Sequence, residues 1–103
     1  MGFIEMITLR RNQFGFEFNC PACAGAIHIF HTTVPLPTGD VWTWDGDIDA
    51  PTFSPSLRVI YKSARENVVS GVCHLFVRAG VLSFCGDSTH GLAGKELPVR
   101  VEP

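Results

Sequence analysis

The sequence predicts a mainly β protein, a single small domain of about six to seven short antiparallel strands, with a zinc-knuckle-like CPxC turn and at most one short helical turn. Three observations support this prediction. Short apolar segments alternate with polar residues, Gly and Pro interrupt the chain often, and four cysteines are available to hold a metal. The chain has 103 residues, which suits one domain spanning residues 1–103.

The first half of the chain predicts three strands. Residues 3–10 alternate and are rich in Ile, Met and Thr, which is typical of a strand. Phe14, Phe16 and Phe18 then alternate with small or polar residues, so their rings share one face and are expected in the core. A further alternating run covers residues 27–31.

The second half predicts the remaining strands after a turn-rich segment, residues 32–56, in which four prolines bar regular helix. The expected strands are residues 57–61, the hairpin arms 72–77 and 81–85, and a last strand at 95–101. Residues 62–67 are polar and predict a loop. Pro98 interrupts the last strand, which suits the edge of a sheet.

The hairpin register determines which side chains can meet, because a slip of one residue moves every side chain to the other face. A two-residue loop needs positive φ at Ala79, which a Cβ resists, so a three-residue loop with a bulge at Gly80 is preferred. This register places His74 and Phe76 on the core face. It pairs Val77 with Val81, Leu75 with Ser83, and Cys73 with Cys85.

Composition argues against several classes of function. The net charge is −2 and no long basic run occurs, so nucleic acid is not a favoured partner. No apolar run approaches the roughly 20 residues that span a bilayer. The N-terminus lacks the features of a signal peptide, which predicts a cytoplasmic protein whose cysteines are ligands or core thiols.

The segment Cys20-Pro-Ala-Cys23 lies between two predicted strands and resembles a zinc knuckle. Its tight turn lets two thiolates converge on one tetrahedral Zn²⁺. A thioredoxin-like redox pair is the alternative, but that motif begins a helix in a βαβ pattern. Plain core cysteines are the other alternative.

The segments Trp42–Asp47 and Pro51–Ser56 have two interpretations. In the structural one they form an ordered loop with aromatic anchors and an Asx turn. In the functional one they wall a site, with hydrogen bonds from Asp45, Asp47, Thr52, Ser54 and Ser56. Farther along, Asp87 either caps a helical turn over residues 88–92 or orients a metal-bound imidazole.

The ordered set CPxC, WTWDGD, PTFSPS, CHxF and DSTHxLAG resembles a small phage- and prophage-associated zinc-binding family of unknown function. Its members often carry the label "ammonia monooxygenase", the name of a membrane copper enzyme. The resemblance covers residues 18–98. It implies that Cys85 is a poor ligand, because relatives usually have an apolar residue there.

From the residues alone, Cys73 and Cys85 could complete a Cys₄ site with the CPxC thiols. The resemblance instead favours two of Cys73, His74 and His90. The candidate metal ligands are therefore Cys20, Cys23, Cys73, His74 and His90, with the set lacking His74 preferred. His28 and His31 are left without a ligand role.

Two functions are weighed. In the first, the chain is a zinc-binding phage or prophage accessory protein, a binding module with a structural Zn²⁺ in the cytoplasm of the bacterial host. It would contact a host or phage protein through Trp44 and Pro51–Ser56. The alternative is a zinc-dependent hydrolase around His74, Asp87 and His90, with His74 and Asp87 as catalytic candidates and Ser54 or Ser56 positioning substrate. A nucleophilic pair of Cys73 and His90 is a third possibility.

Overall fold

Residues 6–65 and 67–103 are described in this computed structural model, and they form eight strands and one 3-10 helix. The elements are β1 (Ile7–Arg11), β2 (Gly15–Asn19), η1 (Pro21–Cys23), β3 (Ile27–His31), β4 (Thr43–Trp44), β5 (Phe53–Lys62), β6 (Val69–Arg78), β7 (Val81–Phe84) and β8 (Glu96–Val101). The prediction of a mainly β fold is confirmed, with one more strand than the largest number expected. The predicted first strand lies partly outside the described residues.

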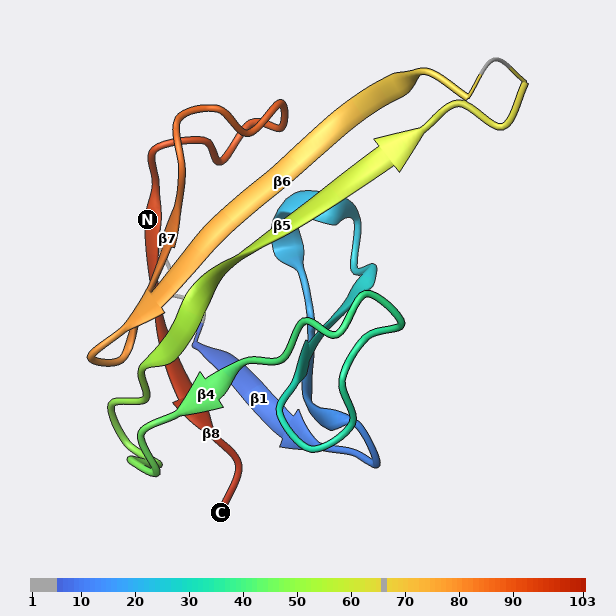
Figure 1. Cartoon of the computed structure of the whole chain (residues 1–103). Coiled ribbons are helices and arrows are strands. Elements are labelled where there is room, and N and C mark those ends of the chain that lie inside the picture. Colours follow the sequence, from blue (N-terminus) through green and yellow to red (C-terminus); the bar gives the residue numbers. More distant parts are fainter. Residues whose placement is uncertain (1–5, 66) are drawn as a thin grey trace.

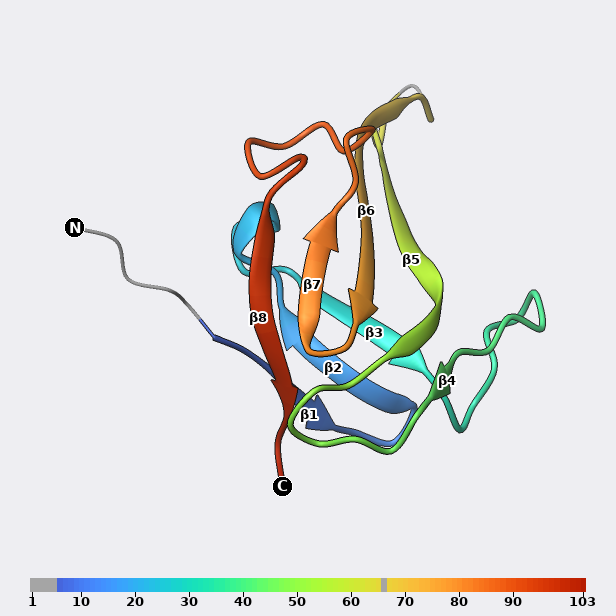
Figure 2. The same ribbon diagram turned by 90° about the vertical axis from the view of Figure 1, so that its left-hand side faces the viewer.

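All eight strands belong to one sheet, in the order β3-β2-β1-β8-β7-β6-β5-β4. Figure 2 shows β8, β7, β6 and β5 running side by side, with β1, β2 and β3 crossing them at a steep angle. The sheet therefore curls over itself and encloses the core. Phe53 on β5 packs against Phe16 and Phe30 of the opposing strands, with ring centroids 5.4 and 4.7 Å away.

The last strand lies inside the sheet, so the prediction that it forms an edge is wrong. Residues 96–98 of β8 pair antiparallel with β7, and residues 99–101 pair parallel with β1. Pro98 sits where the pairing partner changes. The next residue, Val99, donates its N–H to Gly80 O at 2.9 Å, so the strand keeps its place despite the proline.

The predicted register of the β6–β7 hairpin is also wrong, by one residue. Arg78 pairs with Val81, so the loop has two residues, Ala79 at φ +47° and Gly80 at φ +79°. Contacts from the preceding loop hold Ala79 in this unfavourable conformation. Thr52 Oγ1 accepts the Ala79 N–H at 2.9 Å, and Pro51 O accepts the Gly80 N–H at 3.0 Å. These long-range bonds outweigh the local preference.

This register reverses the two faces of β6. Cys73, Leu75 and Val77 are buried, whereas His74 and Phe76 lie on the other face and are half-buried. The neighbours Cys73 and His74 therefore serve different sides of one strand. Figure 1 shows β6 and β5 as a long pair of strands that leads from the hairpin turn to the far loop.

The segment before β5 has the contacts of an ordered loop. Asp45 Oδ1 accepts the backbone N–H groups of Asp47 and Thr52, and Trp44 stacks on Phe53 with centroids 6.2 Å apart. The expected helical turn over residues 88–92 is absent, and a turn begins only at residue 91. No helix within residues 6–65 and 67–103 is long and apolar enough to cross a membrane.

Candidate active site and metal centre

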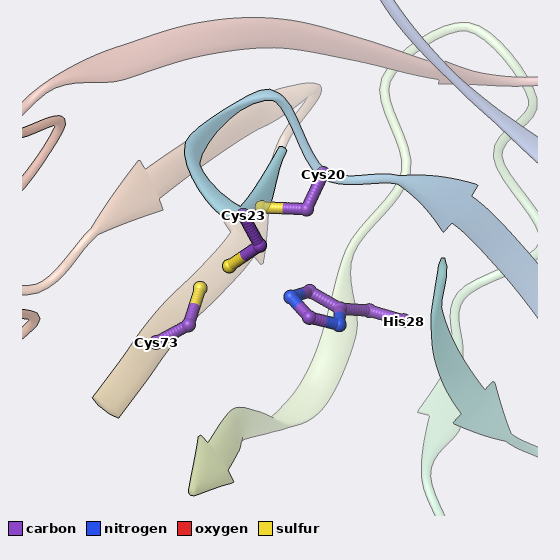
Figure 3. A group of neighbouring side chains, drawn as sticks. All are labelled: Cys20, Cys23, His28 and Cys73. Carbon is purple, nitrogen blue, oxygen red and sulfur yellow. The ribbon is translucent and has the colours of Figure 1, made fainter. Parts of the chain in front are cut away.

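Four side chains converge between the two halves of the curled sheet. Cys20 precedes η1, Cys23 ends it, His28 lies on β3 and Cys73 on β6. One ligand atom from each lies within 4.8 Å of the others. Figure 3 shows the three thiols pointing toward one another, with a nitrogen of the His28 ring turned toward them. The sequence-predicted Cys20, Cys23 and Cys73 are thus brought together.

The CPxC turn is shaped for this convergence. Cys20 O accepts the N–H of Cys23 at 3.2 Å and of Gly25 at 2.9 Å, which closes a tight turn. Ala24 adopts φ +54° and ends η1 in the left-handed conformation. The turn brings both thiols of the motif to the same side, toward β6.

His28 is a candidate metal ligand that was not predicted from the sequence. It is buried on β3 and pairs with Phe18, and its Nε2 is buried without a hydrogen-bond partner among the described residues. A buried ring nitrogen that lacks a partner is costly, and a metal ion would satisfy it. Alternation along β3 could have identified this residue, because it places His28 on the same buried face as Phe30.

Proximity perturbs the acidity of the three thiols. A hydrogen bond from Cys73 lowers the pKa of Cys20 to about 4, and His28 contributes in the same direction. The same pairing, followed by burial, raises the pKa of Cys73. Burial raises the pKa of Cys23, partly offset by a hydrogen bond with Tyr61. One thiolate is therefore favoured at Cys20, and the thiolate is the form that binds metals.

The ligand types and their burial fit a closed structural site. Three sulfurs and one imidazole form a Cys₃His set, one of the usual tetrahedral zinc combinations. Cys20 and Cys73 are fully buried and His28 is 3% exposed. The residues present therefore suit a metal that stabilises the fold.

A second group of polar side chains lies on the other face of β6. His74 Nδ1 lies 3.1 Å from Asp87 Oδ1 and 3.2 Å from Oδ2, and His74 Nε2 lies 3.0 Å from Ser56 Oγ. An ionised carboxylate can only accept, so Nδ1 carries the ring proton. Nε2 is then free to accept the hydroxyl proton of Ser56. This is the hydrogen-bond order of a Ser–His–Asp triad.

Alternation along β5 places Ser56 on this face, because the next residue, Leu57, is buried opposite Leu75. Phe53 pairs with Val77 and Leu57 with Leu75, so β5 has more residues than β6 between these two pairs. This irregularity directly precedes Ser56, and such bulges are common beside active sites. Trp42 Nε1 donates to Ser56 O at 3.2 Å and holds this part of the backbone in place.

Hydrogen bonds from the segment Asp87–His90 to β6 hold Asp87 beside His74. Ser88 Oγ accepts the His74 N–H and donates to His74 O, each at 3.1 Å. Thr89 extends this attachment, because Val72 O accepts its N–H and its Oγ1 accepts the Val72 N–H, both at 2.9 Å. The predicted role of Asp87 as an orienter of an imidazole matches this geometry, although His74 is outside the Cys₃His cluster.

The other predicted residues lie apart from the Cys₃His cluster. The His90 ring packs edge-on against Phe84 with centroids 4.8 Å apart, and its Nδ1 accepts the Leu92 N–H at 3.2 Å. Cys85 lies beside His74 and Asp87. Ser54 is exposed on β5, and its O accepts a hydrogen bond from Thr43 Oγ1.

Fold and sites together describe an all-β protein with a Ser–His–Asp array on one face of a strand and a Cys₃His cluster on the other. Comparison with family models agrees with this description. The chain belongs to the BubE family, described as a bacterial ubiquitination-like system serine protease, whose model matches residues 5–85. The matched region contains Ser56, His74 and all four members of the Cys₃His cluster.

Asp87 lies beyond the end of the family match and is assigned by geometry alone. The family is a bacterial one, and the phage association stays a prediction. No curated protein and no solved structure matches this chain.

Proposed function

We propose that this chain is a serine protease of a bacterial ubiquitination-like system, with Ser56 as nucleophile, His74 as general base and Asp87 as the group that orients His74. The observation that carries the proposal is the continuous hydrogen-bonded array from Ser56 Oγ through His74 to Asp87. The family description supports the same class of chemistry.

In the first step, Ser56 Oγ attacks the carbonyl carbon of the scissile bond while His74 Nε2 takes the hydroxyl proton. The proton on Nε2 then passes to the leaving group, the carbonyl–leaving-group bond breaks, and an acyl ester remains on Ser56. Water attacks this ester with His74 again as base, which releases the acid and restores the Ser56 hydroxyl.

Asp87 acts by holding the correct tautomer. With Nδ1–H donated to the carboxylate, Nε2 faces Ser56 with its lone pair. The negative charge also stabilises the imidazolium that forms during each proton transfer.

The metal in this proposal is Zn²⁺, held by Cys20, Cys23, His28 and Cys73. When bound, it supplies folding free energy rather than a reacting group, because four protein ligands close the tetrahedral coordination shell. Its place against the core side of β6 keeps Cys73 fixed, and with it the next residue, His74.

The alternative of a zinc-dependent hydrolase has less support. That mechanism was expected to use His74, Asp87 and His90 around one metal, whereas His90 packs on Phe84 and lies outside the group of potential ligands that contains His74 and Asp87. The binding surface predicted at Trp44 and Pro51–Ser56 includes the proposed nucleophile, Ser56, so in this proposal it would contact the substrate protein.

The substrate class proposed is the acyl bond at the C-terminus of a ubiquitin-like protein, in the bacterial cytoplasm. The array is accessible to an extended tail, because the side chains of His74 and Asp87 are 21% and 55% exposed. It lies on the surface of the sheet, where a narrow chain end could reach Ser56.

The test is cleavage of a ubiquitin-like protein from such a system that carries a C-terminal extension. Ser56→Ala is expected to abolish cleavage, whereas Ser70→Ala, at an exposed serine near the start of β6, should retain it. Both variants should keep the wild-type melting temperature. Cleavage by Ser56→Ala at the wild-type rate would overturn the proposal.

A further inference from the structure

One thiol beside the triad has no role in the mechanism above. Cys85 directly follows β7, and its N–H donates to His74 O at 2.8 Å. Ligand atoms of His74, Cys85 and Asp87 lie within 4.8 Å of one another. Two members of the triad thus share a cluster with a half-buried cysteine.

These three ligand types suit zinc. Thiolate, imidazole and carboxylate are its usual protein ligands, with bonds of about 2.0–2.3 Å. A tetrahedral ion with such bonds holds its ligand atoms roughly 3.3–3.8 Å apart, so small side-chain movements would close the cluster on an ion. Sulfur and nitrogen ligands also disfavour Mg²⁺ and Ca²⁺, which prefer oxygen.

We propose that His74, Cys85 and Asp87 form a second zinc site, through which Zn²⁺ reversibly inhibits the protease. The site is separate from the Cys₃His centre, which lies on the opposite face of β6. The inhibitory part of the inference rests on the proposed function, whereas the existence of the site does not.

Metal binding and catalysis compete for the same imidazole. Binding releases the Cys85 thiol proton to solvent, and the ion takes a lone pair from His74. If the ion occupies Nδ1, the ring proton moves to Nε2, which then donates to Ser56 and can no longer accept its proton. If it occupies Nε2, the ion takes the place of the Ser56 proton. Asp87 is drawn to the ion in either case, so the triad is disabled.

Three protein ligands leave one coordination position open. Such sites exchange their metal more readily than a closed Cys₃His site, and this one is closer to solvent, since Asp87 is exposed. The two sites are therefore expected to differ in affinity, the buried centre filling first. Free zinc would then set the activity without disturbing the fold.

The experiment begins with protein purified with one equivalent of zinc, so that the buried centre is filled. Isothermal titration calorimetry with ZnCl₂ is expected to show one further equivalent bound by the wild type and none by Cys85→Ser. Titration with Co²⁺ gives a second readout, because a thiolate-to-cobalt absorption band is expected only when Cys85 is present. Cys85→Ala is the second variant should Cys85→Ser fold poorly.

Inhibition is measured in the same proteins, each relative to its own activity without added zinc. Loss of Cys85 is expected to raise the zinc concentration for half-inhibition by at least about 10-fold, since losing even an outer-shell partner of a metal site weakens binding by 10–100-fold. A weak chelator that leaves the buried zinc in place should restore wild-type activity.

The outcomes separate the two proposals. Equal zinc binding by wild type and Cys85→Ser, or no second binding event in either, overturns the site. A second event that depends on Cys85 but leaves cleavage unchanged overturns the inhibition. If the wild type cleaves nothing, the proposed function fails, and calorimetry alone still decides whether the site exists.

Discussion

At the scale of single residues, the neighbours Cys73 and His74 serve two sites at once. Cys73 faces the core beside Cys20, Cys23 and His28, and His74 faces the surface between Ser56 and Asp87. Alternation along a strand makes this division unavoidable. A change that moves one of these side chains therefore disturbs both sites.

Asp87→Asn tests the orienting role of the carboxylate. An amide can hold the wrong tautomer of His74, so kcat is expected to fall by about 10³–10⁴-fold with little change in KM. Asp40→Asn, in an exposed loop, serves as the control and should leave kcat unchanged. A loss of less than tenfold in Asp87→Asn would remove Asp87 from the triad.

The sequence predicted part of the site at this scale. The close CPxC spacing identified Cys20 and Cys23, and Cys73 was among the candidates to join them. His28 was missed because its proximity to Cys73 depends on the curl of the sheet, a long-range property. Ser56 was expected only to position substrate, because its contact with His74 depends on the long-range pairing of β5 with β6.

At the scale of elements, the β6–β7 turn decides which face of β6 is buried. The sequence predicted both arms but chose the wrong register, because local preference disfavours Ala79 at positive φ. The bonds from Pro51 and Thr52 that hold the turn come from a distant segment. The residues of the turn alone could not predict the effect of these bonds. The internal position of β8 also depends on pairing with distant strands and could not be predicted from its own residues.

Two substitutions test whether the turn has two residues, with Ala79 and Gly80 both at positive φ. Gly80→Ala is expected to destabilise the protein by about 1–3 kcal/mol, because a Cβ there meets Ala50 Cα at 3.0 Å and φ is +79°. Ala79→Gly is expected to stabilise it by about 0.5 kcal/mol, since relief of backbone strain exceeds the added entropy of the unfolded chain. Urea unfolding measures both.

If Ala79→Gly were less stable than the wild type and Gly80→Ala more stable, the two-residue turn would be contradicted. In the predicted three-residue register Ala79 has negative φ, so a glycine there would only destabilise.

At the scale of the whole molecule, we expect this small curled sheet to depend on a metal at the Cys₃His centre. The alternation of apolar residues predicted a mainly β fold, and this is confirmed. The curl of the sheet could not be predicted, because it depends on which strands pair with one another, and this order is set by contacts between distant parts of the chain. The Cys₃His centre joins the two halves where they face each other, linking η1 and β3 to β6.

Metal removal is therefore expected to unfold the domain. A structural Zn²⁺ contributes on the order of 10 kcal/mol of apparent folding free energy, which exceeds the stability of many small domains. A strong chelator should lower the melting temperature and abolish activity together. Cys73→Ser should purify without zinc and melt early, whereas Cys85→Ser should retain one equivalent.

A chelator that strips zinc yet leaves the melting curve unchanged would contradict a structural role for the centre. A chelator that abolishes cleavage without changing the fold would point instead to a metal in the reaction.

The most direct test of the central claim is covalent labelling of the nucleophile. An alkyl fluorophosphonate reacts with a serine only when a neighbouring base activates its hydroxyl. Intact mass and peptide mapping are expected to show one adduct on Ser56, absent from His74→Ala although that variant remains folded. An adduct on another serine, or no adduct on a protein that cleaves its substrate, would contradict the Ser56–His74–Asp87 triad.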